Sequence, residues 1–441
     1  MTEPSTSLPL WRQLQAVARV VADIRDGVSS TAALATLPSE LRPGVQALTY
    51  QVLRALGRAQ TLRKLLVPRQ PPAAADALLC SALALIWDEA SAPYESYTLV
   101  NQAVEAAKRT PAVRAQAGFV NGCLRRFLRE REALVVRSSQ EPVADWNHPA
   151  WWIERLRREY PQDWQAILSA NNRQAPMTLR VNCRKTTVDA YLPRLQEAGI
   201  VAWRNGPDGV TLDAALPVAM IPGFAQGWVS VQDAAAQLAA PLLLQGLDLG
   251  AQARVLDACA APGGKTAHLL ERSEAQVVAL EVDALRAQRI TQNLQRLDLN
   301  AQVVVADAAQ PEVWWDGRWF DAILLDAPCT ASGIVRRHPD VRWLRRERDI
   351  SQLAVIQARL LSTLWPLLKP GGRLLYCTCS VFKAEGEQQV QAFLAHNTEA
   401  TLLPSPGHLL PHFAAREGGV RDNQNRDHDG FYYALLEKRA A

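Results

Sequence analysis

The chain has 441 residues and a formal net charge of +4, and 48% of its residues are hydrophobic and 21% are charged. This length predicts about two to four domains, and the composition is that of a packed globular protein, which excludes a disordered or collagen-like chain. The best candidate for an apolar run, Ala73–Trp87, has 15 residues and contains Asp76, so it predicts a buried helix and not a membrane span. The first ten residues lack the pattern of a secretory signal, and seven scattered cysteines suit a reducing compartment, so we expect a cytoplasmic protein.

Residues 1–140 predict an all-α module. Alanine-rich stretches at Ala73–Leu85 and Val100–Lys108 continue a helical pattern that begins near the N-terminus and first stops at Gly27. The first apolar stripe consists of Leu10, Leu14, Val17, Val21 and Ile24.

The basic excess of the chain lies in this module. Residues 1–140 carry 17 Lys/Arg against 11 Asp/Glu, with the highest density in Lys108–Arg137, whereas the rest of the chain carries 31 against 33. A basic module beside a near-neutral remainder is typical of a nucleic-acid-binding attachment. A solvated helical surface is the alternative interpretation of the same charges.

The middle of the chain changes character twice. Residues 141–175 form a tryptophan-rich connector that is partly helical at Trp151–Tyr160. Residues 176–235 contain short alternating runs separated by Pro and Gly, which predict a small α+β unit. These runs are Thr178–Asn182, Gly209–Leu212 and Gly227–Val231.

From residue 236 to 441 apolar strands alternate with amphipathic helices, which predicts a parallel, doubly wound α/β sheet. The helices are expected at Leu285–Leu297 and Ile350–Leu368. The expected strands are Arg254–Cys259, Gln276–Val282, Ala301–Ala306, Phe320–Asp326 and Arg373–Thr378. Ligands of such sheets bind beyond the carboxyl ends of the strands, so we expect the loops at 257–265, 281–283, 307, 326–329 and 378–380 to meet.

The loop after the first of these strands, Asp257–Thr266, combines small residues with paired glycines, so its backbone can approach a ligand closely. Glu281 ends the next strand, where an acid can accept hydrogen bonds from ribose hydroxyls. A phosphate-binding P-loop would need glycine where Cys259 stands, and the dinucleotide fingerprint is absent. A nucleoside without a phosphate tail, such as S-adenosylmethionine, fits better, and Asp307 and Asp326 complete an acidic rim.

Two further strands each deliver a cysteine to the same edge of the predicted sheet. Cys329 follows Asp326 by three residues, and Cys379 follows Cys377 by two. A thiolate is a nucleophile that can add to an electron-poor ring carbon. A disulfide between Cys329 and Cys379, a zinc site that includes Cys377, and plain core packing are the alternatives, and the first two are disfavoured by the compartment and by the absence of a Cys-x-x-Cys knuckle.

Together these motifs resemble those of RNA cytosine-5 methyltransferases of the NOL1/NOP2/Sun group. The motifs are Asp257–Thr266, Asp326–Cys329 and Thr378–Ser380. Further stretches are similar to bacterial 16S rRNA members of the group, and they are Val100–Glu105, Phe119–Gly122, Val335–Asp340 and Asp429–Tyr433. The resemblance implies a NusB-like RNA-binding domain at 1–140, a connector at 141–175, a small α+β RNA-recognition subdomain at 176–235, and a Rossmann-like class I methyltransferase domain at 236–441.

The resemblance also implies a reaction and its residues. The reaction is methylation of one cytosine of 16S rRNA, at position 967 in the usual rRNA numbering, with Cys379 as the nucleophile and Cys329 as the group that assists product release. The implied contacts to S-adenosylmethionine are Cys259, Ala260, Ala261, Pro262, Gly263, Gly264, Lys265, Glu281, Asp307 and Asp326. Glu281 departs from the aspartate that is usual in bacterial members, and Cys377 departs from a small residue.

The chemistry explains why these residue types are needed. Addition of the Cys379 thiolate to carbon-6 of cytosine activates carbon-5 towards a methyl sulfonium, while a protonated or hydrogen-bonded Asp326 stabilises charge at ring nitrogen-3. We expect Lys265 and Arg336 to hold the cytidine or its phosphate. DNA cytosine-5 methyltransferases draw the nucleophile from a Pro-Cys motif, so a cysteine at both places indicates an RNA substrate.

The expected partner is 16S rRNA, free or in an early small-subunit particle, and we expect a monomer without a metal or a membrane attachment. Two alternatives remain open from the sequence. One is the same chemistry on another RNA, such as tRNA. The other is a non-catalytic, RNA-binding ribosome-assembly factor, which the retention of Cys379, Cys329 and Asp326 disfavours.

Overall fold

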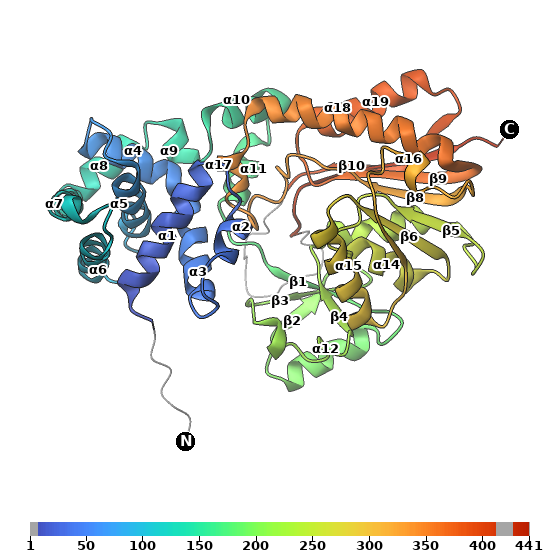
Figure 1. Cartoon of the computed structure of the whole chain (residues 1–441), viewed down its shortest axis with the longest axis horizontal. Coiled ribbons are helices and arrows are strands. Elements are labelled where there is room, and N and C mark those ends of the chain that lie inside the picture. Colours follow the sequence, from blue (N-terminus) through green and yellow to red (C-terminus); the bar gives the residue numbers. More distant parts are fainter. Residues whose placement is uncertain (1–7, 412–426, 441) are drawn as a thin grey trace. The chain divides into compact units, whose positions relative to one another are not determined.

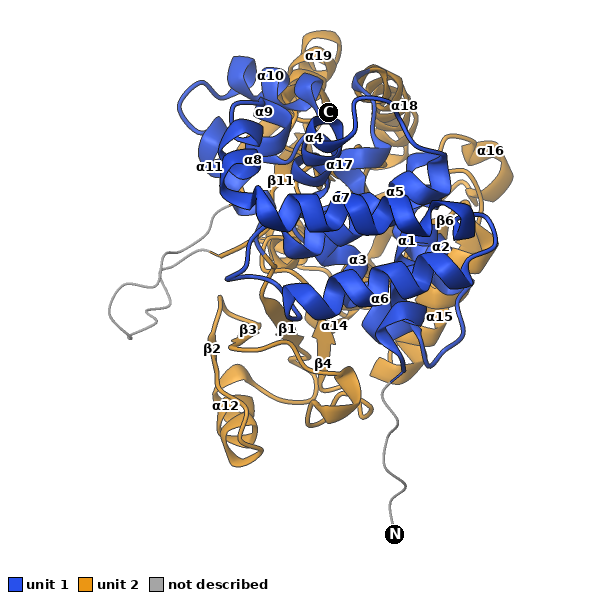
Figure 2. Cartoon of the chain, turned by 90° about the vertical axis from the view of Figure 1, so that its left-hand side faces the viewer, with its two compact units in different colours: residues 1–173, 335–347 blue, residues 174–334, 348–441 orange. Residues whose placement is uncertain are grey.

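The computed structural model describes residues 8–411 and 427–440 (Figure 1). It divides into two compact units, shown in different colours in Figure 2. The N-terminal unit comprises Met1–Arg173 and Val335–Glu347, and the C-terminal unit comprises Gln174–Ile334 and Arg348–Ala441. Among the described residues, no helix is both long enough and apolar enough to cross a membrane.

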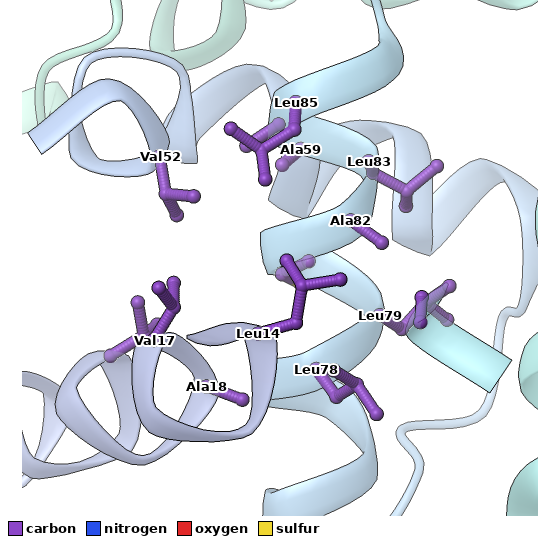
Figure 3. Close-up of a cluster of buried hydrophobic side chains, with 14 of the residues drawn as sticks. Leu14, Val17, Ala18, Val52, Ala59, Leu78, Leu79, Ala82, Leu83 and Leu85 are labelled. Atoms are coloured by element: carbon purple, nitrogen blue, oxygen red, sulfur yellow. The ribbon is translucent and has the colours of Figure 1, made fainter. Parts of the chain in front are cut away.

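The N-terminal unit is helical, as the sequence predicts. Its helices are α1 (Leu10–Arg25), α2 (Ser30–Ala35), α3 (Arg42–Leu53), α4 (Leu56–Leu66), α5 (Ala73–Ile86), α6 (Ser96–Arg109), α7 (Ala117–Arg129), α8 (Arg131–Ser138), α9 (Pro142–Trp146), α10 (Ala150–Glu159), α11 (Trp164–Asn171) and α17 (Val341–Leu344). The apolar stripe of α1 packs against α5, and Leu14, Leu78 and Ala82 belong to the core drawn in Figure 3. Gly27, which follows α1, has a φ of 95°, a backbone conformation that favours glycine.

Helix α5 is the apolar stretch that the sequence interprets as a buried helix, and every residue from Ala75 to Ile86 is buried. Its one charged residue, Asp76, lies 2.8 Å from a guanidinium nitrogen of both Arg25 and Arg63. Two opposite charges compensate the buried carboxylate, which on its own would be costly in an apolar core. The interpretation of this stretch as a buried helix is therefore confirmed.

Residues 335–347 group with the N-terminal unit, although the sequence analysis assigns them to the C-terminal domain. Asp340 accepts a hydrogen bond from the backbone nitrogen of Ser30 at 2.9 Å. The buried Arg342 guanidinium donates to the carbonyl oxygens of Asn147 at 3.1 Å and Asn171 at 2.6 Å. These bonds join residues far apart in the chain, which local sequence patterns do not reveal.

The C-terminal unit begins with a small antiparallel sheet in the order β2-β3-β1-β4, accompanied by α12 (Val188–Glu197). Its strands are β1 (Met177–Val181), β2 (Ala202–Arg204), β3 (Gly209–Leu212) and β4 (Val229–Val231). Leu179, Val210 and Val229 lie in its apolar core together with Tyr191 of α12. The predicted small α+β unit is therefore present, and three of its four strands coincide with the runs identified in the sequence.

A seven-stranded sheet follows, in the order β10-β11-β9-β8-β5-β6-β7. Its strands are β5 (Arg254–Asp257), β6 (Gln276–Glu281), β7 (Gln302–Val305), β8 (Phe320–Asp326), β9 (Leu368–Thr378), β10 (Ala400–Leu409) and β11 (Phe431–Lys438). Strands β5 to β9 pair in parallel, as predicted, whereas β11 pairs antiparallel with both β9 and β10. The parallel pairing of the five predicted strands is therefore confirmed, whereas β10 and the antiparallel β11 were not predicted from the sequence.

Helices cover both faces of this sheet (Figure 1). One face packs its buried strand residues, such as Val255 and Leu324, with Leu269 of α14 (Gly264–Arg272) and Ile290 of α15 (Ala284–Leu297). The other face packs residues such as Ile323 with residues of α18 (Glu347–Leu364) and α19 (Glu387–His396). Successive strand residues point to opposite faces, which explains the near-continuous apolar runs that predict a doubly wound sheet.

Candidate functional site

The order of the strands brings the predicted loops to one edge of the large sheet. Strand β5 lies between β6 and β8, and β9 follows β8. In parallel pairs all carboxyl ends lie at the same edge, so the loops after β5, β6, β8 and β9 are neighbours there. This edge is where ligands of open α/β sheets bind.

The loop after β5 is fixed by backbone hydrogen bonds to both neighbouring strands. The amide nitrogen of Ala258 donates to the Leu324 carbonyl at 2.9 Å, and that of Ala260 donates to the Leu280 carbonyl at 2.8 Å. Gly263 has a φ of 96°, and a Cβ added there would lie 3.1 Å from Ile290. Glycine is therefore required by both the backbone conformation and the space. Helix α14 starts at Gly264, directly after this glycine.

Acidic residues stand at the ends of β6 and β7, as expected. Glu281 is buried, accepts a hydrogen bond from the Asp283 amide nitrogen at 3.1 Å, and lies 3.5 Å from a guanidinium nitrogen of Arg286. Asp283 is the N-cap of α15, and its Oδ1 accepts hydrogen bonds from the amides of Leu285 and Arg286. Asp307 follows β7, and its Oδ1 accepts a hydrogen bond from the Ala309 amide at 2.9 Å.

The two predicted cysteines meet at the next pair of strand ends. The Sγ atoms of Cys329 and Cys379 lie 3.4 Å apart, which is within hydrogen-bonding distance for sulfur. Both residues are free thiols of intermediate burial. The sequence places them 50 residues apart, so only the parallel pairing of β8 and β9 accounts for their contact.

A charged pair lies beside the cysteines. The ammonium Nζ of Lys265 lies 2.6 Å from Asp326 Oδ2, and Cys377 Sγ lies 3.5 Å from Asp326 Oδ1. Cys377 is fully buried and belongs to the apolar core on one face of the sheet. The carboxylate thus bridges the loop after β5 to the strand that carries Cys379.

The electrostatic environment divides the roles of these groups. The hydrogen bond to Cys379, followed by burial, raises the pKa of the Cys329 thiol well above its ordinary value, so Cys329 keeps its proton at neutral pH and can donate it to the Cys379 sulfur. Burial tends to lower the pKa of Lys265, but the charge and hydrogen bond of Asp326, together with the nearby Cys377 and Cys379, outweigh it and raise that pKa. Burial, with the charge of Asp326, also raises the pKa values of Cys377 and Cys259.

Asp257, at the end of β5, belongs to the same edge although the sequence analysis gives it no role. It is fully buried and its Oδ2 accepts a hydrogen bond from Thr266 Oγ1 at 2.7 Å. Burial raises the pKa of this carboxyl to about 7. Thr330 and Ser380 directly follow the two cysteines. The sequence predicts no role for them, although a hydroxyl residue next to each cysteine is visible in it.

Arg336 is placed differently from the other predicted site residues. It is buried, with 1% of its surface exposed, and lies in the segment 335–347 that groups with the N-terminal unit. Its carbonyl oxygen accepts a hydrogen bond from Arg54 at 2.8 Å. The C-terminal unit by itself therefore brings together Lys265, the acidic residues and the cysteines, but not Arg336.

The described residues contain no group of three or more His, Cys, Asp or Glu side chains arranged to hold a metal ion. The site is instead suited to a nucleoside ligand: the glycine-containing loop allows close approach, Glu281 and Asp307 are positioned as hydrogen-bond acceptors, and a thiol pair stands beside Lys265 and Asp326. A base that reached this sheet edge would meet a nucleophile, an ammonium donor and a carboxylate acceptor together.

Three known protein families match successive stretches of the chain. Residues 13–129 match the NusB family. Residues 148–219 match the ferredoxin-like domain of RsmF/B-like methyltransferases. Residues 244–437, which include every strand of the large sheet except the last residue of β11, match the family described as 16S rRNA methyltransferase RsmB/F.

Individual proteins are similar over most of the chain. Ribosomal RNA small subunit methyltransferase B of Vibrio cholerae is 40% identical over 425 residues, which cover 94% of each chain. The crystal structure of PH0851 superposes with a TM-score of 0.74 at 26% identity, covering 96% of this chain and 99% of that one. A methyltransferase homolog protein from Pyrococcus horikoshii gives a TM-score of 0.55 at 28% identity, covering 67% of this chain and 97% of that one.

Proposed function

Because the chain belongs to the family of ribosomal RNA small subunit methyltransferase B, we propose that it transfers a methyl group from S-adenosylmethionine to carbon-5 of one cytosine in 16S rRNA. The observation that carries the proposal is the 3.4 Å contact between Cys329 Sγ and Cys379 Sγ beside the Lys265–Asp326 pair. A nucleophile, a second thiol that can later take the carbon-5 proton, and a charged pair at one sheet edge are the groups that this reaction needs.

S-adenosylmethionine supplies an electrophilic methyl group, and residues of the C-terminal unit would hold it. The loop Cys259–Lys265 provides a close-fitting backbone, because a Cβ at Gly263 would contact Ile290. Glu281 and Asp307, at the ends of β6 and β7, would accept hydrogen bonds from the nucleoside. The fit rests on these acceptors and on the glycine loop.

Cys379 starts the reaction. Its thiolate adds to carbon-6 of the cytosine, and the electron pair of the carbon-5–carbon-6 double bond moves into the ring, where it activates carbon-5 for methylation. The ammonium of Lys265, kept protonated by Asp326, would donate a hydrogen bond to the ring as negative charge reaches nitrogen-3. Asp326 would accept a hydrogen bond from the exocyclic amino group, which distinguishes cytosine from uracil.

Cys329 ends the reaction. The hydrogen bond to Cys379 and the charge of Cys379 raise the pKa of Cys329 in the resting enzyme. When the Cys379 sulfur is bonded to carbon-6 it carries no charge, so the charge of Cys379 no longer raises the pKa of Cys329, although burial still does. Cys329 would then release its proton to water and, as a thiolate, take the carbon-5 proton, or do so through a water that it positions. The ring double bond re-forms as the carbon–sulfur bond breaks, and Cys379 leaves as a thiolate.

The test is methyl transfer from labelled S-adenosylmethionine to unmodified 16S rRNA, offered as naked RNA and as a partly assembled small-subunit particle. We expect label in the RNA with the wild-type chain and none with Cys379→Ala. Absence of label with both substrates would contradict the proposal and would favour an RNA-binding assembly factor. Bisulfite mapping of rRNA from a deletion strain tests the target, and we expect loss of one 5-methylcytosine, at position 967.

Several finer points belong to the same proposal. The cytosine must leave its helix or be unpaired to reach the pocket. The basic N-terminal unit would bind rRNA, and Arg336 would contact the substrate when the RNA is bound. We further propose that the protein acts as a monomer in the cytoplasm.

A further inference from the structure

A buried carboxylate lies behind the two cysteines and has no role in the reaction described above. Glu385 ends the 3-10 turn Lys383–Glu385 and has no exposed surface. Its Oε1 accepts hydrogen bonds from the Thr330 amide nitrogen at 2.8 Å and from Gln357 Nε2 at 3.3 Å. Its Oε2 accepts hydrogen bonds from the hydroxyls of Thr330 and Ser380, the latter at 2.6 Å.

These donors come from the two loops that carry the thiols. Thr330 directly follows Cys329, and Ser380 directly follows Cys379. One carboxylate therefore joins the residues next to both cysteines. The backbone of Glu385 is itself fixed to β9, because its carbonyl oxygen accepts a hydrogen bond from the Tyr376 hydroxyl at 2.8 Å.

A serine completes the connection between the loops. The Oγ atoms of Ser332 and Ser380 lie 2.9 Å apart, and Ser332 Oγ accepts a hydrogen bond from the Val381 amide nitrogen at 2.9 Å. The Gly333 amide donates to the Cys379 carbonyl oxygen at 2.9 Å. The loop after β8 and the loop after β9 are thus joined through several polar contacts, and Glu385 accepts the largest number of them.

Burying a carboxylate in a protein core costs free energy unless its oxygens are hydrogen-bonded. Burial raises the pKa of Glu385, and the hydrogen bonds from Ser380 and Thr330 oppose that rise. Buried ionisable groups are often replaceable by apolar residues without loss of stability, but fully satisfied networks fix one geometry. We therefore expect this carboxylate to fix the positions of the two loops, and with them the contact between the two thiols.

We propose that Glu385 is a positioning residue that holds the Cys329 and Cys379 loops at the distance at which the two sulfurs touch. The consequence for methyl transfer rests on the proposed function, whereas the effect on the distance between the thiols does not. Without Glu385, the Thr330 amide and two hydroxyls lose their shared acceptor, and the two loops separate.

The distance between the thiols can be measured without any methyl transfer. Diamide removes two electrons and two protons from a pair of thiols, so that a sulfur–sulfur bond forms and diamide is reduced to its hydrazine. One thiolate first adds to diamide, and the second sulfur then displaces the reduced diamide from the first. At diamide concentrations at which the rate no longer depends on diamide, the rate of Cys329–Cys379 disulfide formation, followed by mass spectrometry of the full chain, reports how often the two sulfurs are in contact. We expect Glu385→Ala to slow it about tenfold or more, because hydrogen bonds to a charged acceptor are lost.

Matched variants separate positioning from general damage. Glu385→Gln keeps the shape and one acceptor oxygen, so we expect an intermediate rate. Ser380→Ala removes one arm of the network, and we expect about a fivefold slowing from the loss of one hydrogen bond. Asp76→Asn removes a buried, paired carboxylate of the N-terminal unit, so it should lower the melting temperature and leave the disulfide rate unchanged.

Two outcomes would overturn the inference: no Cys329–Cys379 disulfide in the wild-type chain, or the wild-type rate in both Glu385→Ala and Ser380→Ala. If Glu385→Ala does not fold, Ser380→Ala alone decides. Single-turnover methylation of rRNA should fall in parallel with the disulfide rate, at unchanged affinity for S-adenosylmethionine. If no chain methylates rRNA but the disulfide rates change as expected, the proposed function fails and the positioning role stands.

Discussion

Arg180 of β1 joins the small sheet to helix α14 and gives the sharpest test of how the C-terminal unit is held together. Its guanidinium donates to both carboxylate oxygens of Glu271, at 2.8 and 2.7 Å, and to the carbonyl oxygen of Gly264 at 2.7 Å. The two side chains are 0% and 1% exposed. Helix α14, which carries Glu271 and begins at Gly264, is therefore fixed through one buried cation.

The change Arg180→Ala leaves the Glu271 carboxylate buried without the guanidinium that it pairs with. Removal of one partner of a buried pair costs about 3–5 kcal/mol of unfolding free energy, and the near-complete burial of this pair places the variant in that range. The control is the double variant Arg180→Met with Glu271→Leu, which removes both charges and should recover most of the loss. The double variant should still lose about 1 kcal/mol of unfolding free energy, because the Gly264 carbonyl loses its hydrogen-bond donor.

The penalty should depend on pH in a defined direction. Burial raises the pKa of Glu271, and Arg180 opposes that rise, so the pKa rises further in Arg180→Ala. A carboxyl with a raised pKa binds its proton more tightly in the folded state, so stability is greatest below the pKa of the unfolded state and falls as the pH rises through the folded value. Urea unfolding followed by circular dichroism at several pH values measures this. A loss below about 1 kcal/mol, or one that does not shrink on acidification, would refute the reasoning.

Three further predictions concern the site itself. Gly263→Ala forces a side chain onto a φ of 96° and against Ile290. A left-handed conformation costs a non-glycine residue about 1–2 kcal/mol, so we expect affinity for S-adenosylmethionine, measured by calorimetry, to fall about tenfold or more. Unchanged affinity would show that the loop does not hold the cofactor. Lys265→Met removes the ammonium beside Asp326. We expect the single-turnover methylation rate to fall about a hundredfold, the scale of one lost electrostatic contact in a transition state. A drop confined to the affinity for S-adenosylmethionine would speak against a role of Lys265 at the cytosine. Burial raises the pKa of Asp257 to about 7, so its contribution to stability falls as the pH rises from the ordinary aspartate range to about 7, and Asp257→Asn should flatten that part of the stability curve in thermal melts.

Much of the fold follows from local patterns. The span of β8, Phe320–Asp326, coincides with its predicted range, and α15 begins one residue before its predicted start. Strong apolar periodicity bounded by turns fixes such elements without help from the rest of the chain. The contact between Cys329 and Cys379 was also predictable, because the carboxyl ends of parallel strands share an edge.

Other features depend on contacts between distant parts of the chain. The sequence analysis did not foresee β10, an edge strand that carries Pro404 and Pro406 and lacks the apolar run of a central strand. Strand β11 was not predicted either, and its antiparallel direction is defined by its pairing with β9. Residues 335–347 group with the N-terminal unit through Asp340 and Arg342, which no local pattern shows.

Glu385 shows the same limit within the site. Its neighbours Lys383 and Gly386 suggest a solvated turn, and an isolated acid in such a stretch carries no sequence signal. Only the folded structure brings Thr330 and Ser380 to one carboxylate.

The division of labour between the two thiols is tested most directly by mapping the covalent RNA adduct of Cys329→Ala. This variant is incubated with S-adenosylmethionine and 16S rRNA, separated on a denaturing gel, and digested for mass spectrometry. We expect RNA to remain attached to the protein, with the modified nucleotide on the peptide that contains Cys379 and no adduct in Cys379→Ala. An adduct on any other residue, or one that persists in Cys379→Ala, would contradict the account.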